Sequence, residues 1–119
     1  MKKYLPYGRQ SITNKDISSV KKILKSDFLT TGPTIKLFEK SLSKFCRSKF
    51  AVAVNSATSA LHIACLSLGI KKGDIVWTSP ISFVASANCA IYCGAKIDFI
   101  DIDINSFNIS IENLKKKLI

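Results

Sequence analysis

Residues 50–68, FAVAVNSATSALHIACLSL, decide how the rest of the chain can be interpreted. The first five of them, from Phe50 to Val54, are a continuous apolar run with the length of a buried strand. Small hydroxyl and amide residues follow at once, and apolar side chains then recur at helical spacing up to Leu68. The sequence therefore predicts a strand, a polar turn and a helix in immediate succession.

The polar turn between this strand and helix has two possible roles. The first turn of a helix carries unpaired backbone N–H groups at the positive end of the helix dipole, which is a favourable place for a phosphate. Alternatively, a Ser or Thr of this turn is an ordinary N-cap that satisfies these donors without any ligand. The residues of the turn, taken alone, favour neither role.

Length and composition limit the chain to one folded domain. Its 119 residues can bury one core, and an apolar content of 47% with 22% charged residues is typical of folded proteins. Eighteen lysines and arginines against eight acidic residues give a net charge of +10, which permits anionic partners. Most lysines fall on the polar faces of predicted helices, and no aromatic-plus-basic stripe occurs, so we expect no nucleic-acid partner.

The cysteines and the apolar runs indicate the compartment. Cys46, Cys65, Cys89 and Cys93 do not combine with histidines into a four-ligand zinc pattern, so we expect buried, reduced thiols and no metal. No signal-peptide pattern and no apolar run of membrane-spanning length occur. These features predict a cytoplasmic protein that does not bind a membrane.

The sequence before residue 50 predicts an extended arm and two amphipathic helices. Residues 1–12 show no periodicity. Thr13 and Asp16 have the spacing of a capping box at the start of the first helix. The turn signal Gly32-Pro33 separates it from the second helix, for which Thr30 and Thr31 are candidate caps.

The sequence after residue 68 predicts alternating strands and helices. Strands are predicted at residues 75–78 and 95–100, a helix at 81–92 with Gly94 as its C-terminal cap, and a last helix capped by Ser110. This order is typical of a parallel sheet with right-handed crossovers, whose ligands lie beyond the carboxyl ends of the strands. Those ends are residues 55–59, 78–83 and 101–105, all of them rich in polar side chains.

Two common site types and one candidate catalytic residue can be set aside. The sequence contains neither the G-x-x-x-x-G-K-[ST] pattern of a nucleoside-triphosphate loop nor the G-x-G-x-x-G of a dinucleotide fold. The single histidine, His62, lies within an apolar helix without an evident acid or nucleophile beside it. We interpret it as a core residue and not as a catalytic base.

Two long motifs identify a family resemblance. NSATSALHIA at residues 55–64 and KKGDIVWTSPISFVASANCAIYCGAKIDFIDID at residues 71–103 resemble the DegT/DnrJ/EryC1/StrS sugar aminotransferases, which use pyridoxal 5′-phosphate (PLP). Within the family they are most similar to the transaminases of pseudaminic-acid biosynthesis, and the resemblance runs from Tyr7 to the last helix. It implies an α/β fold, the N-terminal part of the large domain of fold type I (aspartate aminotransferase-like) PLP-dependent transferases. Residues 1–33 would form the arm and first helix, and residues 34–119 the start of the PLP-binding domain.

The resemblance also assigns the cofactor-binding residues. It implies that Ser56, Ala57 and Thr58 hold the PLP phosphate through backbone N–H groups and a hydroxyl. Many relatives have glycine where Ala57 stands, but alanine still permits a close backbone approach. Phe83 matches the aromatic residue that stacks on the pyridine ring, and its alternative role is that of a core aromatic beside Val84 and Ala87.

The same resemblance implies contacts to a nucleotide sugar. Tyr7, the segment Asp27, Phe28, Leu29 and Thr30, and Ala57 fall at the positions that contact it. For Tyr7 and Phe28, packing at the surface or against a second subunit is an equally good interpretation. The family resemblance further implies an active site at a homodimer interface. The similarity to the pseudaminic-acid transaminases implies amino transfer from glutamate to a UDP-linked 4-keto-6-deoxy-hexosamine.

No residue of this chain is assigned a catalytic role. The resemblance places the Schiff-base lysine and the carboxylate that pairs with the pyridinium nitrogen beyond Ile119. We therefore expect a fragment or a truncated gene product that is inactive and poorly stable alone. The alternatives are a related sugar dehydratase, a transaminase for another sugar, and a non-catalytic phosphate-binding protein.

Overall fold

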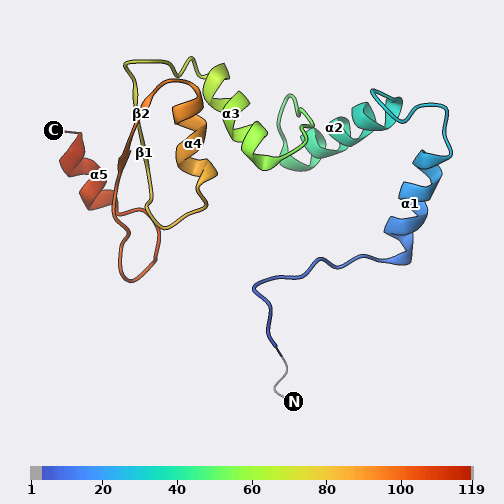
Figure 1. Ribbon diagram of the computed structural model, residues 1–119, viewed down its shortest axis with the longest axis horizontal. Coiled ribbons are helices and arrows are strands. Elements are labelled where there is room, and N and C mark those ends of the chain that lie inside the picture. Colours follow the sequence, from blue (N-terminus) through green and yellow to red (C-terminus); the bar gives the residue numbers. More distant parts are fainter. Residues whose placement is uncertain (1–3, 119) are drawn as a thin grey trace. The chain divides into compact units, whose positions relative to one another are not determined.

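The computed structural model describes residues 4–118, which fall into two compact units with their boundary between Ala53 and Val54 (Figure 1). The first unit contains two helices, α1 (Asn14–Leu24) and α2 (Pro33–Cys46). The second contains three helices and two strands: α3 (Ala57–Ser67), β1 (Ile75–Thr78), α4 (Ala85–Tyr92), β2 (Lys96–Phe99) and α5 (Ile111–Lys117).

Helix α1 begins with the predicted capping box. The Thr13 hydroxyl oxygen accepts a hydrogen bond from the Asp16 backbone N–H at 3.3 Å, and the Asp16 carboxylate accepts one from the Thr13 N–H at 2.7 Å. These two bonds satisfy donors that would otherwise lack a partner at the helix start. The capping box predicted from the sequence is therefore confirmed.

The capping box should make α1 sensitive to acid. Hydrogen bonds from the Thr13 backbone and then from its hydroxyl hold the pKa of Asp16 below its ordinary value of about 3.9. Because the pKa is depressed in the folded state, the stabilisation is present above about pH 4 and is lost as the pH falls through the lowered pKa. The Cα chemical shifts of α1 should therefore move towards random-coil values between about pH 4 and pH 2.

Helix α2 provides the control, since it has no acidic residue in its first turn. Its Cα shifts should change less than those of α1 over the same range. A helical α1 that persists unchanged at pH 2 would contradict the role given to Asp16.

The start of α2 differs from the expectation. Gly32 and not Thr30 or Thr31 is the N-cap, and Pro33 is the first helical residue. Proline fits this position because it has no N–H to satisfy, and it forces the preceding residue into the extended conformation that an N-cap needs. A side chain at Gly32 would come within 2.8 Å of the Phe28 Cβ, which explains the glycine.

The prediction of a strand at residues 50–54 is wrong for the part of the chain that the structure describes. Phe50 to Val54 forms neither helix nor strand. A strand needs a neighbouring backbone, and the Ala53 N–H instead donates to the Glu39 carboxylate at 2.9 Å. The apolar run is not paired with another strand among the described residues, and Phe50 is exposed by 76% and Val52 by 71%.

The second unit is built on a pair of parallel strands. Ile75 pairs with Lys96 and Thr78 with Phe99, and the connection between the strands contains α4, which packs against both of them and against α3 (Figure 1). Parallel strands with a helical crossover confirm the predicted α/β class. Helix α4 ends as predicted, with Gly94 following the last helical turn at a φ of 80°.

Helix α4 begins four residues later than predicted, at Ala85 and not at Ile81. Side-chain hydrogen bonds hold the preceding residues in a non-helical turn. The Ile81 N–H donates to the Ser79 hydroxyl at 3.2 Å, and the hydroxyls of Ser82 and Ser86 bond each other at 3.0 Å. Serine side chains of this kind compete with the first backbone bonds of a helix.

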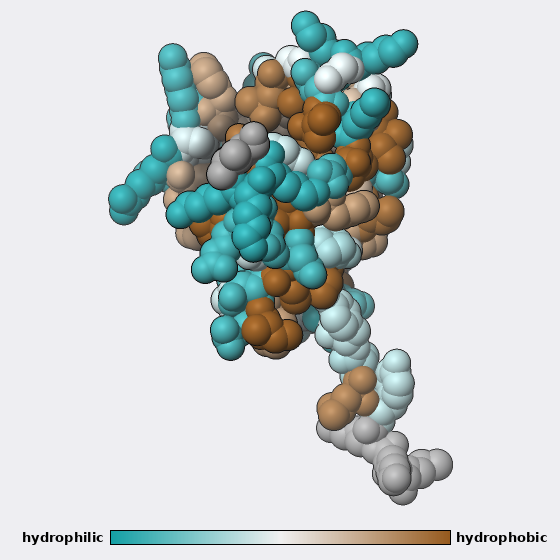
Figure 2. Space-filling view, turned by 90° about the vertical axis from the view of Figure 1, so that its left-hand side faces the viewer, coloured by the Kyte–Doolittle hydropathy of each residue, from teal (hydrophilic) through white to brown (hydrophobic). Residues whose placement is uncertain are grey.

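The buried core of the described residues lies within the second unit, and it is small. It comprises Ala85, Cys89, Ala90, Ala95 and Ile100, of which Ile100 is the largest fully buried side chain. Many larger apolar side chains reach the surface, where Figure 2 shows them in brown beside teal hydrophilic ones.

Helix α5 is attached to β2 through an acidic side chain. The Asp98 carboxylate forms an ion pair with Lys117 and accepts a hydrogen bond from the Trp77 indole N–H at 3.2 Å. The hydrogen bond from Lys117 is the main cause that lowers the pKa of Asp98. One carboxylate therefore connects β1, β2 and α5.

Candidate functional site

The turn before α3 is an N-cap. The Ser56 hydroxyl accepts a hydrogen bond from the Ser59 N–H at 3.1 Å, and the Ser56 carbonyl accepts one from the Ala60 N–H at 3.1 Å. The Asn55 side chain supports this arrangement by accepting a bond from the Ser59 hydroxyl at 2.8 Å. Two donors of the first turn are thus satisfied within the chain.

The other two donors of this turn remain available. Among the described residues, the backbone N–H groups of Ala57 and Thr58 have no hydrogen-bond acceptor, and Ala57 is exposed. They are the first two residues of an eleven-residue helix, so the helix dipole favours an anion beside them. This part of the chain fits the phosphate group of PLP, with the Thr58 hydroxyl as a further donor on the same turn.

Phe83 lies beyond the carboxyl end of β1, between that strand and α4. Its side chain is 74% exposed, so the alternative role of a core aromatic is wrong for the described residues. It borders a cavity of about 210 Å³ whose wall includes Ser79, Ser82 and Phe99. An accessible aromatic face at the carboxyl edge of a parallel sheet fits an aromatic ring of a ligand.

The predicted site residues belong to both units and, within the second unit, to two separate places. Ser56, Ala57 and Thr58 do not line the cavity beside Phe83. Tyr7 and residues 27–30 belong to the first unit, where Tyr7 is fully exposed and Phe28 is 61% exposed. In the second unit, the start of α3 and the surroundings of Phe83 are thus two separate candidate elements of a site.

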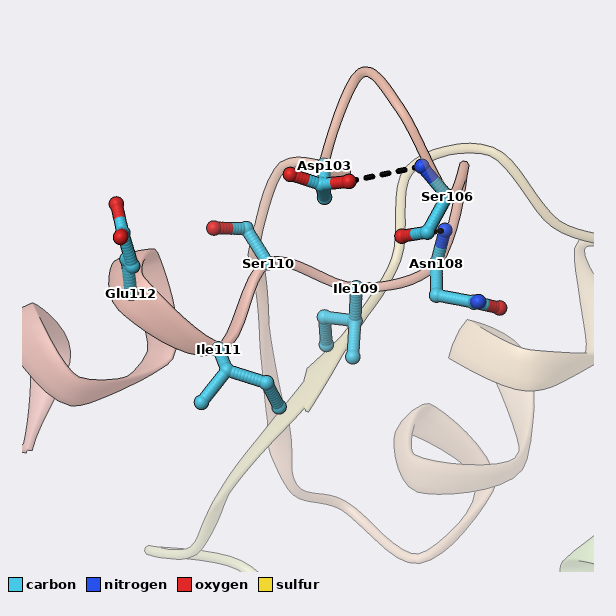
Figure 3. A pocket seen from close by; sticks show the side chains of 7 residues that line it. All are labelled: Asp103, Ser106, Asn108, Ile109, Ser110, Ile111 and Glu112. Carbon is cyan, nitrogen blue, oxygen red and sulfur yellow. Dashed lines mark hydrogen bonds between the residues drawn. The ribbon is translucent and has the colours of Figure 1, made fainter.

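A larger cavity of about 490 Å³ lies between the loop after β2 and the start of α5 (Figure 3). Asp103 lies at its edge, and its carboxylate accepts backbone hydrogen bonds from Ser106 at 2.8 Å and Asn105 at 3.1 Å. The bonds from Ser106, followed by the bond from Asn105, lower the pKa of Asp103. This carboxylate stabilises the loop, so the cavity does not by itself indicate a ligand.

The histidine and most of the cysteines are more exposed than the sequence predicted. His62 is half-buried, with its ring 5.4 Å from that of Tyr92 in an edge-on arrangement. All four cysteines are free, but Cys89 alone is buried and Cys46 is exposed. Within residues 4–118, no three His, Cys, Asp or Glu side chains are arranged to hold a metal ion. No helix in that range is long and apolar enough to cross a membrane.

Similar solved structures are aminotransferases, one of them solved in its PLP-form. A putative sugar aminotransferase of Streptococcus pneumoniae in its PLP-form is 30% identical, with a TM-score of 0.88 over 94% of this chain and 29% of that chain. The aminotransferase of Psychrobacter cryohalolentis gives a TM-score of 0.84 at 31% identity over 93% of this chain and 29% of that chain. The fold of this chain is therefore that of part of a PLP-dependent transferase.

The chain belongs to the DegT/DnrJ/EryC1/StrS aminotransferase family, whose sequence profile matches residues 10–119. A UDP-4-amino-4,6-dideoxy-N-acetyl-beta-L-altrosamine transaminase of Campylobacter jejuni is 44% identical over 115 residues, or 97% of this chain and 30% of the relative. The spore coat polysaccharide biosynthesis protein SpsC of Bacillus subtilis is 44% identical over 89% of this chain and 27% of its own length. The chain thus spans about 30% of the length of these relatives. PLP is the cofactor of the family.

Proposed function

We propose that the chain is the N-terminal, phosphate-binding part of a nucleotide-sugar aminotransferase. The reaction would be amino transfer from glutamate to a UDP-linked 4-keto-6-deoxy-hexosamine in the biosynthesis of pseudaminic acid or a related surface sugar. The Campylobacter jejuni relative, which covers 97% of this chain, supports this choice of substrate. The four free thiols support a cytoplasmic location.

One observation carries the proposal, namely the two free N–H groups of Ala57 and Thr58 at the start of α3. PLP would supply the electron sink for chemistry at the amino-bearing carbon. The residues of this chain would only position it: Ala57 and Thr58 would bind its phosphate, next to the Ser56 cap, and Phe83 would stack on its ring. We assign no catalytic residue here and expect the chain to be inactive alone.

The nucleotide sugar would contact the first unit and the start of α3. We propose Tyr7, residues 27–30 and Ala57 for this role, in a homodimeric enzyme. The exposure of Tyr7 and Phe28 supports the assignment, because both side chains are free to meet a ligand or a second subunit. Residues 34–119 would form the start of the PLP-binding domain.

A sugar dehydratase is a second candidate. The structure of a GDP-4-keto-6-deoxymannose-3-dehydratase matches this chain with a TM-score of 0.87 at 28% identity, over 95% of this chain and 31% of that chain. The two reactions differ at the catalytic position, lysine in the transaminase and histidine in the dehydratase. The residue at that position in the parent gene distinguishes the candidates.

The phosphate site can be tested by removing one donor. Proline at residue 57 lacks the N–H but suits the first position of a helix, and the extended Ser56 is compatible with a following proline. Ala57→Pro should weaken binding of pyridoxamine 5′-phosphate by about 10- to 100-fold, since a hydrogen bond to a charged group contributes about 1.5–3 kcal/mol. Pyridoxamine 5′-phosphate is the suitable probe because it has no aldehyde to react with surface lysines. Amide chemical-shift titration of the ¹⁵N-labelled chain measures the affinity.

The matched control is Ile111→Pro, which places proline at the first position of α5. This variant should bind the probe as tightly as the unmodified chain does. Pyridoxamine, which lacks the phosphate, should bind to neither protein. Equal affinity of Ala57→Pro and the unmodified chain would refute the phosphate site. A non-catalytic phosphate-binding protein would pass this test but would lack aminotransferase activity in its full-length form.

A further inference from the structure

Three of the four cysteines meet where α3 packs against α4. Cys65 lies one turn along α3 from His62, and Cys89 lies one turn along α4 from Tyr92. The rings of His62 and Tyr92 contact each other edge-on at 5.4 Å. Residues three apart on a helix share a face, so the two cysteines lie on the faces through which the helices touch.

The surroundings of these thiols differ from those of Cys46. Cys89 is 4% exposed, and its Sγ donates to the Ser86 carbonyl at 3.4 Å. The pKa of the Cys65 thiol is raised to about 11. The main cause is burial, and the neighbouring thiols of Cys89 and then Cys93 add to it. Cys46 is exposed and belongs to the other unit.

We propose that Cys65 and Cys89 form a dithiol that a small-molecule disulfide oxidises to a disulfide bond between α3 and α4. The Cys65 thiolate attacks the reagent and forms a mixed disulfide, which releases one reagent thiolate. Cys89 then attacks the Cys65 sulfur and releases the second. The two protein thiols lose two electrons and two protons, and the reagent disulfide is reduced to two thiols.

Accessibility and acidity determine the order and rate of the two steps. Cys65 is half-buried and can meet the reagent, whereas Cys89 is too buried to meet it first. Only the thiolate attacks, so the rate should rise about tenfold per pH unit below the raised pKa of Cys65. The reaction should therefore be slow at pH 7 and about 100-fold faster at pH 9.

Oxidised glutathione and peptide mapping test the proposal in the full 119-residue chain. Trypsin separates Cys65 from Cys46 but leaves Cys89 and Cys93 on one peptide, so the experiment uses Cys93→Ser for an unambiguous product. At pH 9 this variant should give a peptide that links Cys65 to Cys89, while Cys46 carries glutathione. Cys89→Ser added to Cys93→Ser should instead leave glutathione on Cys65.

The reaction in urea provides the control for a chance encounter in an unfolded chain. Cys46 is closer in sequence to Cys65 than Cys89 is, so the unfolded chain should link Cys46 to Cys65 at least as often. The proposal is overturned if the chain without urea shows this same distribution, if Cys65 stays unmodified at pH 9, or if Cys93→Ser abolishes the crosslink. A dominant link between Cys65 and Cys89 supports it.

Discussion

Heated alone, the 119-residue chain should lose its helical circular dichroism gradually, without the sharp sigmoid of a cooperative domain. A cooperative transition needs a large core that is lost all at once. In the described residues the core consists of five mostly small side chains, while Phe45 and Leu68 are exposed by 86% and 79%. Such exposed apolar surface also invites association, as do the open edges of a two-stranded sheet.

Two measurements check this result. The chain should bind the dye ANS strongly at 25 °C, and its melting curve should broaden or show aggregation as protein concentration rises. A monomer that melts in one steep, reversible and concentration-independent step would show that the exposed side chains do not limit its stability.

Ile100→Ala should remove the protection of the sheet against hydrogen exchange. Ile100 is 1% exposed, and truncating a fully buried isoleucine to alanine costs about 2–5 kcal/mol. The amides to follow are Lys96, which donates to the Asp74 carbonyl at 2.9 Å, and Ile100, which donates to the Thr78 carbonyl at 3.0 Å. Their exchange should accelerate by about 30-fold or more, up to the rate of an unfolded chain.

The control substitution has the same chemistry at an exposed position. Ile104 is 75% exposed, so Ile104→Ala should leave both amides within a few-fold of their original exchange rates. If the two variants exchange alike, the packing around Ile100 does not hold β1 and β2 together.

Sequence patterns predicted the structure well where neighbouring residues determine it. The capping box of Thr13 and Asp16 and the cap at Ser110 are formed within a few residues, and both occur as predicted. The strands after residue 74 were also predicted, because their apolar runs are bounded by turn residues and pair with each other.

Predictions failed where the outcome depends on partners. Residues 50–54 have the composition of a buried strand, but no neighbouring backbone pairs with them in the described chain. Composition cannot reveal that absence. The late start of α4 depends on hydroxyl contacts of Ser82 and Ser86, which helical periodicity does not encode.

The two elements of the candidate site illustrate the same division. Small polar residues before an apolar helix were equally compatible with a phosphate site and an ordinary N-cap. The structure shows the Ser56 cap, and beside it the free N–H groups of Ala57 and Thr58. The exposure of Phe83 depends on how the segment before α4 folds. The sequence alone therefore could not decide whether this side chain is buried in the core or accessible to a ligand. A family resemblance was needed to associate this ring with a cofactor.

The contact of Trp77 with Asp98 has a spectroscopic consequence. The chain contains a single tryptophan, and its indole N–H donates to the carboxylate that also holds Lys117 of α5. We therefore expect the emission of this tryptophan to change when the ion pair between Asp98 and Lys117 breaks. Its fluorescence would then follow the attachment of α5 without any added label.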